Sequence, residues 1–299
     1  MRCGVILLCI LAGIGGIATL IPGGGRIFRS WVFVIPELLL GLNLFLCSVR
    51  RFPELVRRMR AGARPGILGS WLCHLGMLIL LTGLFLGQFL NRSAYVYGVP
   101  GQEKEVAGTS LSVTIEAFEA VYREDGSAEQ YRSWITVTDP VTGETRSGEL
   151  AVNHPFSAFG LDFLQSGTGW AVTADFVGRD GNRASGILCE GEVIEMADAP
   201  LQLILQPDEG AVGTEKTEVN ARFYYDGELW GEQRVKIGET VEVNGFRFSF
   251  RDPRRYTMIQ VVSEPAEPVV LLGGILLLLG AVITVVFRSR EGRKQEEEK

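Results

Sequence analysis

Histidine and cysteine are scarce in this 299-residue sequence. Only two histidines, His74 and His154, and five cysteines occur, and there is no CxxC, CxxCH, G-x-S-x-G or H-E-x-x-H motif. These absences argue against a thioredoxin-like reductase, a c-type cytochrome, an α/β-hydrolase and a zinc protease. The cysteines are too few for a disulfide scaffold, and the 37 glycines show no triplet period that would indicate collagen.

The cysteines are also badly placed for pairing. Four of them lie in or beside long apolar segments: Cys3, Cys9, Cys47 and Cys73. Cys189 alone lies in the polar middle of the chain, so that region cannot form an internal disulfide. We interpret all five as small, adaptable apolar residues.

Acidic residues are concentrated in the middle of the chain. Between Asn91 and Glu267 there are 29 acidic and 15 basic residues, a net charge of −14, whereas the remainder has 6 acidic and 14 basic residues. The mean hydropathy of +0.19 is high for a soluble enzyme of this size. An acidic middle flanked by apolar segments with basic edges indicates a membrane protein with one extramembrane domain.

Four apolar stretches are long enough to cross a bilayer, which takes roughly 20 helical residues. They are Val5–Ile21, Trp31–Val49, Gly66–Leu90 and Val269–Phe287. The expected loop 50–65 between the second and third stretches is rich in arginine, as is the tail after the fourth (Arg50, Arg51, Arg57, Arg58, Arg60 and Arg64; Arg288, Arg290, Arg293 and Lys294). The positive-inside rule then places both termini in the cytoplasm and the acidic domain outside.

The first stretch has a second interpretation, a cleaved signal peptide. Its apolar run is longer than a usual signal core, and no A-x-A-like site follows, so we expect an uncleaved helix. The sequence therefore predicts a three-helix membrane region (1–90), an extracytoplasmic domain (91–267), and a fourth transmembrane helix with a cytoplasmic tail (268–299).

The extracytoplasmic domain has the pattern of β-structure. Apolar residues alternate in several segments: Leu111-Val113-Ile115, Trp134-Thr136-Thr138, Leu201-Leu203-Leu205, Phe223-Tyr225 and Phe246-Phe248-Phe250. Asn244-Gly245 separates two such runs and is a strong hairpin signal, and Asp226-Gly227 is a second turn. We expect one all-β sandwich-like or barrel-like domain of about 8 to 12 strands with a single core.

His74 is the candidate ligand within the membrane segments. It lies eight residues past Gly66, roughly 12 Å along the helix, and an ionisable side chain at such a depth normally faces a bundle interior. A neutral imidazole there can ligate a haem iron or another metal. The alternative is a histidine hydrogen-bonded to a neighbouring helix.

Other residues of the membrane segments have two interpretations each. Trp71, three residues before His74, shares its helix face and suits contact with a planar macrocycle or anchoring at the membrane interface. Glu37 either pairs with a base such as Arg29 or lies near the interface. Small residues at Gly83-x-x-x-Gly87 and Ala12-x-x-x-Gly16 have the spacing of close helix packing.

His154, in the segment VNHPF, precedes a proline and is expected in a loop or at a strand end. His74 is 16 residues from Leu90, roughly 24 Å of helix, so the two histidines should not bind one iron within a chain.

The sequence resembles the ResB family, also called CcsB, of system II cytochrome c maturation. The resemblance runs from IATLIPG after the first apolar segment through SWVF and LNLFLCSVRR in the second. It continues with HLGMLILLTGLFLG, whose His74 falls on the family's membrane histidine, and with YRSWITV and LAVNHPFSAFGLDFLQSGTG in the acidic domain. It closes with TMIQVVSEPAEPVVLLGGILLLLGAVITVVFRSR.

The resemblance implies a bacterial inner-membrane protein that works with a ResC (CcsA) partner to carry haem across the membrane and attach it to apocytochrome c. His74 would be one axial haem ligand, with the other supplied by the partner, and His154 would contact haem or apocytochrome. The chain would then be no enzyme by itself but one component of a cytochrome c synthase (haem lyase). A thioredoxin-like reductant is a further partner consistent with this pathway, and nucleic acid is not one.

Two other functions stay open at this stage. One is a membrane-anchored structural or sensory protein whose β-domain binds a partner and whose His74 only packs. The other, a small-solute transporter, is disfavoured because the sequence has no inverted repeat or paired broken helices.

Overall fold

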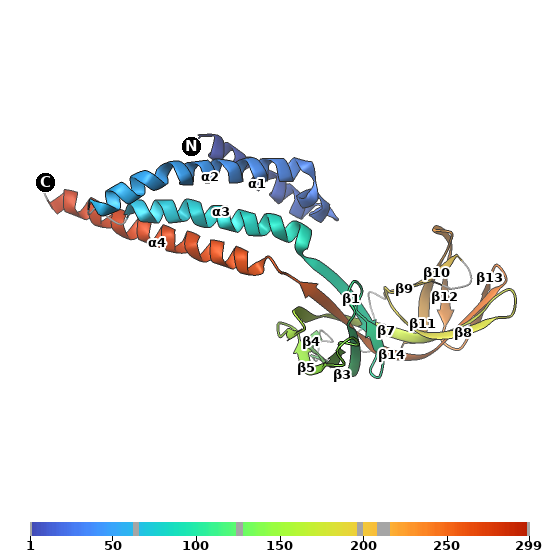
Figure 1. Cartoon of the computed structure of the whole chain (residues 1–299). Helices are drawn as coiled ribbons and strands as arrows, with labels where there is room; N and C mark the ends of the chain where they lie inside the picture. Colours follow the sequence, from blue (N-terminus) through green and yellow to red (C-terminus); the bar gives the residue numbers. More distant parts are fainter. Residues whose placement is uncertain (1, 62–65, 124–127, 196–199, 208–215, 298–299) are drawn as a thin grey trace. The chain divides into compact units, whose positions relative to one another are not determined.

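The computed structural model describes residues 2–61, 66–123, 128–195, 200–207 and 216–297. The chain divides into two compact units (Figure 1). The helical unit comprises Met1–Arg92 and Glu264–Lys299, and the β-unit comprises Ser93–Ser263. Arg64, and the side chains of the basic tail from Arg288 onward, lie outside the described part.

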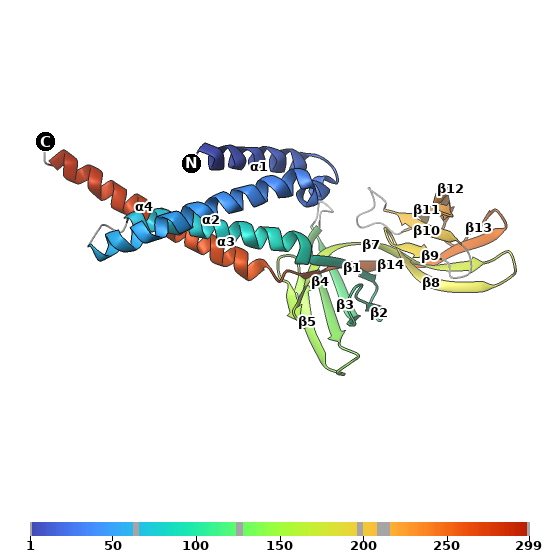
Figure 2. The same ribbon diagram turned by 45° about the horizontal axis from the view of Figure 1, so that its top comes forward.

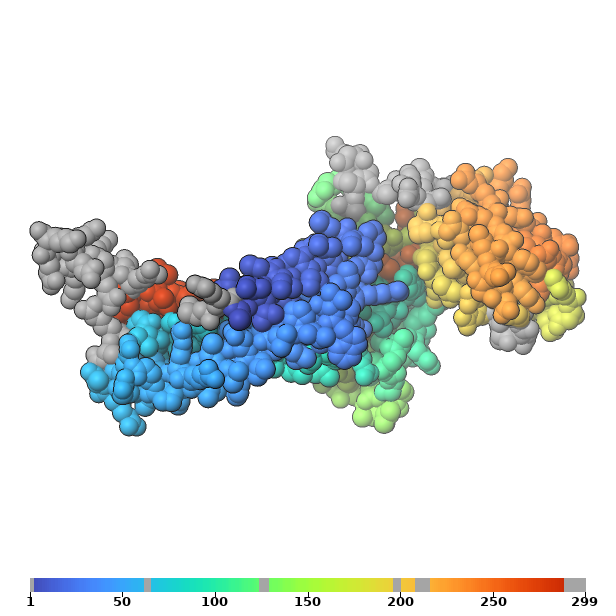
Figure 3. Space-filling view, turned by 90° about the horizontal axis from the view of Figure 1, so that it is seen from above, coloured from blue at the N-terminus to red at the C-terminus, as the bar shows by residue number. Residues whose placement is uncertain are grey.

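The described residues of the helical unit form four long α-helices and one short 3₁₀ helix. They are α1 (Arg2–Leu20), η1 (Gly24–Arg29), α2 (Trp31–Arg60), α3 (Gly66–Leu90) and α4 (Glu267–Glu297). All four α-helices are long and apolar enough to cross a membrane. Helix α3 packs between α2 and α4, and α1 packs on α2. Helix α2 extends beyond α1, so part of its surface is open (Figures 2 and 3).

The prediction of a basic loop at 50–65 is wrong for residues 50–60, which continue helix α2. Their polarity ends the apolar run but not the helix, because arginine is a good helix former. Glu54 supports this end of the helix by pairing with Arg57 and Arg58 one turn away. Likewise, the helical backbone of α4 continues past Phe287 to Glu297, where we expected a tail.

Glycines bring α3 and α4 into close contact. Three glycines seven residues apart on α3, namely Gly69, Gly76 and Gly83, each leave no room for a side chain against α4. A Cβ atom on Gly76 would lie 2.4 Å from the backbone nitrogen of Leu277. The predicted Gly83-x-x-x-Gly87 motif is therefore half correct, because a Cβ atom on Gly87 would meet only Asn91. In the other predicted motif, Ala12-x-x-x-Gly16, a Cβ atom on Gly16 would meet nothing within 4 Å.

The β-unit contains fourteen strands among the described residues, more than the expected 8 to 12. The strands are β1 (Arg92–Gly98), β2 (Glu103–Glu105), β3 (Ser112–Tyr122), β4 (Ala128–Thr138), β5 (Thr145–Ala151), β6 (Phe156–Ala158), β7 (Leu161–Val177), β8 (Arg183–Cys189), β9 (Val193–Glu195), β10 (Leu201–Gln206), β11 (Glu218–Tyr225), β12 (Glu228–Lys236), β13 (Thr240–Val243) and β14 (Phe246–Ser263). They form one six-stranded sheet and two four-stranded sheets.

The long strands β7 and β14 run through the whole β-unit and pair with each other antiparallel. Sheet β2-β3-β4-β5 lies toward one end of this pair and sheet β12-β11-β10-β9 toward the other (Figures 1 and 2). Two irregularities interrupt the pairing: Ser166 is unmatched on β7, and Asp252 with Pro253 lies opposite Val172. Such bulges bend a strand, which lets one strand pair serve two cores.

The expectation of one core is wrong, because the buried side chains form separate clusters. One contains Val113, Ile135 and Phe163, and another contains Leu203, Phe223 and Phe248. A small cluster that includes Cys189 and Tyr256 is distinct from both. Alternation along β4 was predicted correctly, but the buried face is the other one. Ser133, Ile135 and Val137 are buried, whereas the predicted residues Trp134, Thr136 and Thr138 are only partly buried.

The two predicted glycine turns are confirmed. Asn244 and Gly245 both have positive φ, at 51° and 82°, between the paired strands β13 and β14. Asp226 and Gly227, with φ of 52° and 80°, join β11 to β12 in the same way. These values are those that a tight two-residue hairpin turn requires.

Candidate functional site

An open apolar groove lies between α2 and α3 in the helical unit. We call it the α2–α3 groove; its volume is about 400 Å³, and its lining includes Glu37, Leu38, Leu42, Phe45, Leu81 and Phe85. This volume falls in the range of roughly 300–1,000 Å³ that small-molecule sites occupy. The groove therefore offers an apolar surface large enough for a flat organic ligand.

His74 lies on the wall of α3 that continues this groove. Leu78, Leu81 and Phe85, which line the groove, follow His74 by four, seven and eleven residues. Because a helix turns once every 3.6 residues, these four side chains share one face over about 16 Å. The histidine and the groove thus belong to one face of α3.

The hydrogen bond of His74 determines its tautomer. Nδ1 lies 2.7 Å from the carbonyl oxygen of Ser70, one turn earlier in α3. A carbonyl oxygen can only accept, so Nδ1 carries a proton, and in a neutral imidazole Nε2 then has the lone pair. This is the arrangement that orients a histidine for metal ligation through Nε2. The partner of Nδ1 lies in the same helix, and the contacts of the described residues give no bond from the ring to a neighbouring helix.

Trp71 connects α3 to α2. Its indole Nε1 donates to the carbonyl oxygen of Ser48 at 3.2 Å, and its ring packs on Phe52 at 5.6 Å between centroids. On the opposite side, the Sγ atom of Cys73 lies 3.8 Å from the carbonyl oxygen of Leu277 in α4. The residues around His74 therefore hold α3 against both neighbouring helices.

Glu37 lies at the other end of the groove and is only 4% exposed. Its carboxylate accepts a hydrogen bond of 2.8 Å from Nε2 of Gln88 in α3. The suggested partner Arg29 is not bonded to it among the contacts of the described residues. The amide oxygen of Gln88 is buried without a partner.

His154 is exposed in a tight turn of the β-unit. It forms an isolated bridge with Ala151, with backbone hydrogen bonds of 2.9 and 3.0 Å, and Asn153 between them has φ of 64°. The prediction of a loop or strand end is confirmed. His74 and His154 belong to different units of the chain.

The described residues contain no group of three His, Cys, Asp or Glu side chains that could hold a metal ion. A self-contained metal centre is thus not formed within the part that the structure describes. A metal held by a planar macrocycle needs only one or two axial protein ligands, and the free Nε2 of His74 fits that requirement.

A buried polar cluster in the β-unit was not predicted from the sequence. Lys216 and Glu190 form an ion pair of 2.6 Å; Glu190 also accepts from the backbone of Trp170, and its own carbonyl accepts from Tyr256. Neighbouring Cys189 is fully buried, and this burial raises the pKa of its thiol, which disfavours the reactive thiolate. The interpretation of Cys189 as a packing residue is consistent with this environment.

The segment FLQSGTG has a structural role. Gln165 is buried and accepts from Ser133 at 2.7 Å, while its amide nitrogen donates to Thr257 at 3.0 Å and to the carbonyl of Gly167 at 2.9 Å. These bonds link β4, β7 and β14 at the bulge made by Ser166. The glutamine thus satisfies polar groups at an irregular point of the sheet.

Comparison with known proteins matches part of this chain to one family. Residues 64–202, from α3 to the start of β10, match the model of the ResB-like family. The relatives include cytochrome c biogenesis protein CcsB of Prochlorococcus marinus (strain NATL1A), 24% identical with 80% of this chain and 58% of that protein covered. CcsB of Synechococcus sp. (strain WH7803) is 28% identical, with coverages of 76% and 55%. Ccs1 of Rhodomonas salina is 24% identical, with coverages of 74% and 54%.

The chain spans just over half the length of these relatives. The resemblance to the ResB family is confirmed by the family match and by these relatives. The solved structure of a cytochrome c haem lyase, CcmF, aligns with 94% of this chain and 34% of that chain, at 10% identity and a TM-score of 0.32. A score this low does not establish a shared fold.

Proposed function

We propose that this chain, ResB-like over residues 64–202, is a haem-handling subunit of system II cytochrome c maturation. The relatives named as cytochrome c biogenesis proteins support the pathway. The observation that carries the proposal is the hydrogen bond of His74: Nδ1 donates to Ser70, which leaves Nε2 of the neutral imidazole as the ligating nitrogen, on the face of α3 that also lines an apolar groove.

Haem is cargo in this proposal, and the chain's own residues hold it in place. Nε2 of His74 supplies one axial ligand, and the α2–α3 groove covers one apolar edge of the macrocycle. Ser70 keeps the imidazole in the ligating tautomer, and Trp71 fixes α3 against α2 through Ser48. The second axial ligand comes from a ResC/CcsA-type partner, with which this chain delivers haem to apocytochrome c.

The chain forms part of a synthase in this proposal and has no catalytic residue of its own. We further propose that all four apolar helices span the bacterial inner membrane, with both termini in the cytoplasm and the β-unit outside. The arginine-rich end of α2 supports this orientation through the positive-inside rule. Fusions of alkaline phosphatase after Gly98 and after Arg60 test it: activity is expected only for the first.

The proposal is tested by the absorption spectrum of the complex. We would co-express the chain with a ResC-type partner and compare the wild type with His74→Ala. We expect the Soret band to weaken or shift in His74→Ala and to be restored by added imidazole. A folded complex without haem in every form would contradict the proposal and favour a structural or sensory protein.

A further inference from the structure

One edge strand of the β-unit, β8, is open to a new strand. β8 pairs with β7 along one side, and its first four residues, Arg183–Gly186, are exposed. Its other side has no strand partner among the described residues. An unpaired edge presents backbone donors and acceptors on which another chain can pair.

The register shows which backbone groups are available. In the ladder between β7 and β8, the backbone N–H of Glu190 donates to the carbonyl of Trp170, and the N–H of Gly178 donates to the carbonyl of Asn182. The residues whose backbone groups bond across this ladder are therefore the even-numbered ones. In an antiparallel ladder such pairs alternate with non-bonded ones. The N–H and C=O groups of Arg183, Ser185 and Ile187 therefore point to the free edge.

A pocket adjoins this edge on the inner side of the sheet. Its volume is about 210 Å³, and it is lined by residues of the five strands β7, β8, β9, β10 and β14, including Phe176, Ala184, Leu188, Ile194, Leu203 and Phe248. Both β8 and β9 line it, and these are edge strands of two different sheets that do not pair with each other among the described residues. The volume is below the roughly 300 Å³ of a typical small-molecule site and suits inserted side chains.

Small residues keep the pocket open. Ala184 and Gly186 project toward it, because inward and outward side chains alternate along β8 and Leu188 is in the core. A Cβ atom on Gly186 would meet nothing within 4 Å. A strand added beside β8 would place every second side chain over this pocket.

The edge strands β12 and β5 carry more charges than β8. The exposed edge strand β12 carries Glu228, Glu232, Arg234 and Lys236, and β5 carries Arg146 and Glu149. Charges of this kind protect an edge from unwanted pairing. β8 has a single charged residue, Arg183, and no proline.

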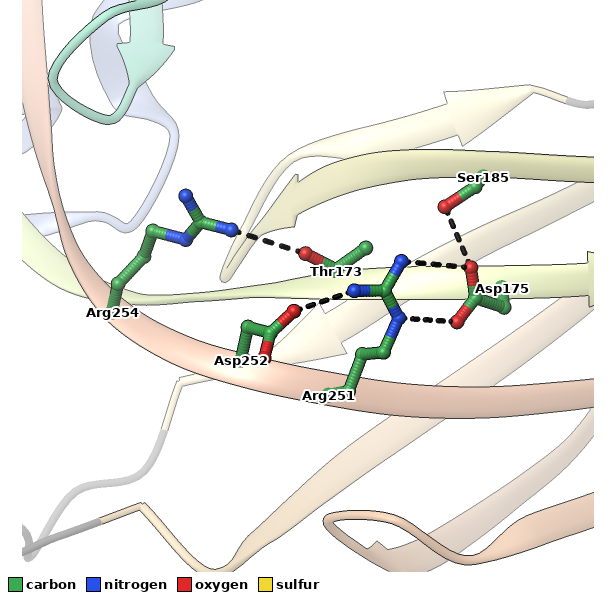
Figure 4. A network of polar contacts seen from close by, with 6 residues as sticks. All are labelled: Thr173, Asp175, Ser185, Arg251, Asp252 and Arg254. Atoms are coloured by element: carbon green, nitrogen blue, oxygen red, sulfur yellow. Dashed lines mark hydrogen bonds and ion pairs between the residues drawn. The ribbon is translucent and has the colours of Figure 1, made fainter.

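The outer face of β8 is held in place by a polar network (Figure 4). Ser185 donates to Asp175 on β7 at 2.6 Å, and Asp175 accepts from Arg251 on β14 at 2.7 Å. This network involves side chains and leaves the backbone groups of Ser185 at the edge unused. Within the part of the chain that the structure describes, this edge is therefore unpaired, and side-chain bonds hold it against β7.

We propose that β8 and the adjoining pocket bind an extended, basic polypeptide by strand addition, with apolar side chains at alternate positions. The unpaired backbone groups require a strand, the pocket requires apolar side chains, and Glu195 in its lining within a region of net charge −14 favours a basic chain. This inference does not depend on haem ligation at His74.

The test uses the full chain in detergent micelles and a fluorescein-labelled ten-residue peptide that alternates valine with lysine or threonine. Fluorescence polarisation measures binding. A matched peptide, N-methylated at the positions that would pair with β8, should bind at least tenfold more weakly. A peptide of the same composition in scrambled order should also lose affinity, since its apolar residues no longer alternate.

Variants locate the site. Ser185→Pro removes an outward N–H and leaves the backbone bonds to β7 in place, whereas Ser185→Ala keeps that N–H. Both variants lose the hydroxyl bond to Asp175, so their melting temperatures are compared with each other. Gly186→Val narrows the pocket, and Gly231→Val, at an equally open glycine on the edge strand β12, is its matched control. We expect tenfold or greater loss of affinity for Ser185→Pro and Gly186→Val, and no loss for Ser185→Ala and Gly231→Val.

Two results would overturn the proposal. One is equal peptide affinity in all four variants, which would indicate general attraction to the acidic surface. The other is a dimer seen by sedimentation that Ser185→Pro disrupts, without peptide binding, which would assign the edge to a second copy of this chain. The haem spectrum of the His74 variants is independent of both, so failure of one proposal does not decide the other.

Discussion

Lys216 and Glu190 form an ion pair of 2.6 Å in which the two side chains are only 2% and 6% exposed. Removing one member leaves the other charge buried without compensation, which costs about 3–5 kcal/mol. We therefore expect Lys216→Met to lower the unfolding midpoint of the β-unit strongly. Tryptophan fluorescence during chemical denaturation measures this change.

The matched control for that variant is Lys104→Met. Lys104 pairs with Glu192 at 3.2 Å, but the two side chains are 27% and 22% exposed. Water compensates the remaining charge there, so the loss should be no more than about 1 kcal/mol. Equal losses in the two variants would contradict the assignment of a buried, uncompensated charge.

Gly76 provides a second prediction, on the contact between α3 and α4. Gly76→Ala places a methyl group 2.4 Å from the backbone nitrogen of Leu277, so one helix has to shift. Overpacking of this kind costs roughly 1–3 kcal/mol. We expect a lower thermal midpoint in detergent, whereas Gly274→Ala on α4, which meets nothing within 4 Å, should not lower it.

The helical unit was largely predictable because long apolar runs identify spans without reference to tertiary contacts. The glycine contact was harder to predict. The predicted packing motifs have a spacing of four residues, whereas Gly69, Gly76 and Gly83 recur every seven, as do Gly273 and Gly280. A heptad of small residues was visible in the sequence and would have indicated the face that meets α4.

The β-unit was less predictable. Alternation and glycine turns identify strands and hairpins, yet they do not determine which strands pair, so the division into separate cores was missed. The ion pair of Glu190 and Lys216 joins residues 26 positions apart in regions with no shared pattern. His74 was identified as a ligand candidate from its depth in an apolar segment, but its tautomer depends on the bond to Ser70.

Thr257 gives a third prediction, on the buried network around Gln165. Thr257→Val preserves shape but leaves the second amide hydrogen of Gln165 without its acceptor, at a cost of about 1–3 kcal/mol. We expect a lower unfolding midpoint and faster hydrogen exchange at the Ser166 bulge. Thr136→Val is the control, since Thr136 bonds to Ser147 at the exposed face and its loss should be nearly neutral. Similar exchange at the bulge in wild type and Thr257→Val would refute this role.

The last prediction concerns pH and the network of Asp175 (Figure 4). Arg251 and Ser185 donate to the carboxylate of Asp175, and these bonds hold its pKa below the usual range. A pKa lowered by folding contributes stability that is fully present above the unfolded value of about 3.9 and is lost as pH falls through the folded pKa. The stability difference between wild type and Asp175→Asn should therefore shrink below about pH 4.

Arg251→Gln separates the cause of this shift from its consequence. The variant removes the first donor to Asp175 and leaves Ser185 in place, so the pKa of Asp175 should rise toward its ordinary value. Carboxyl carbon NMR across a pH titration measures that pKa directly. Because β8 is tied to the sheet through Ser185 and Asp175, the variant should also increase hydrogen exchange in β8. An unchanged pKa of Asp175 would show that Arg251 does not control this carboxylate.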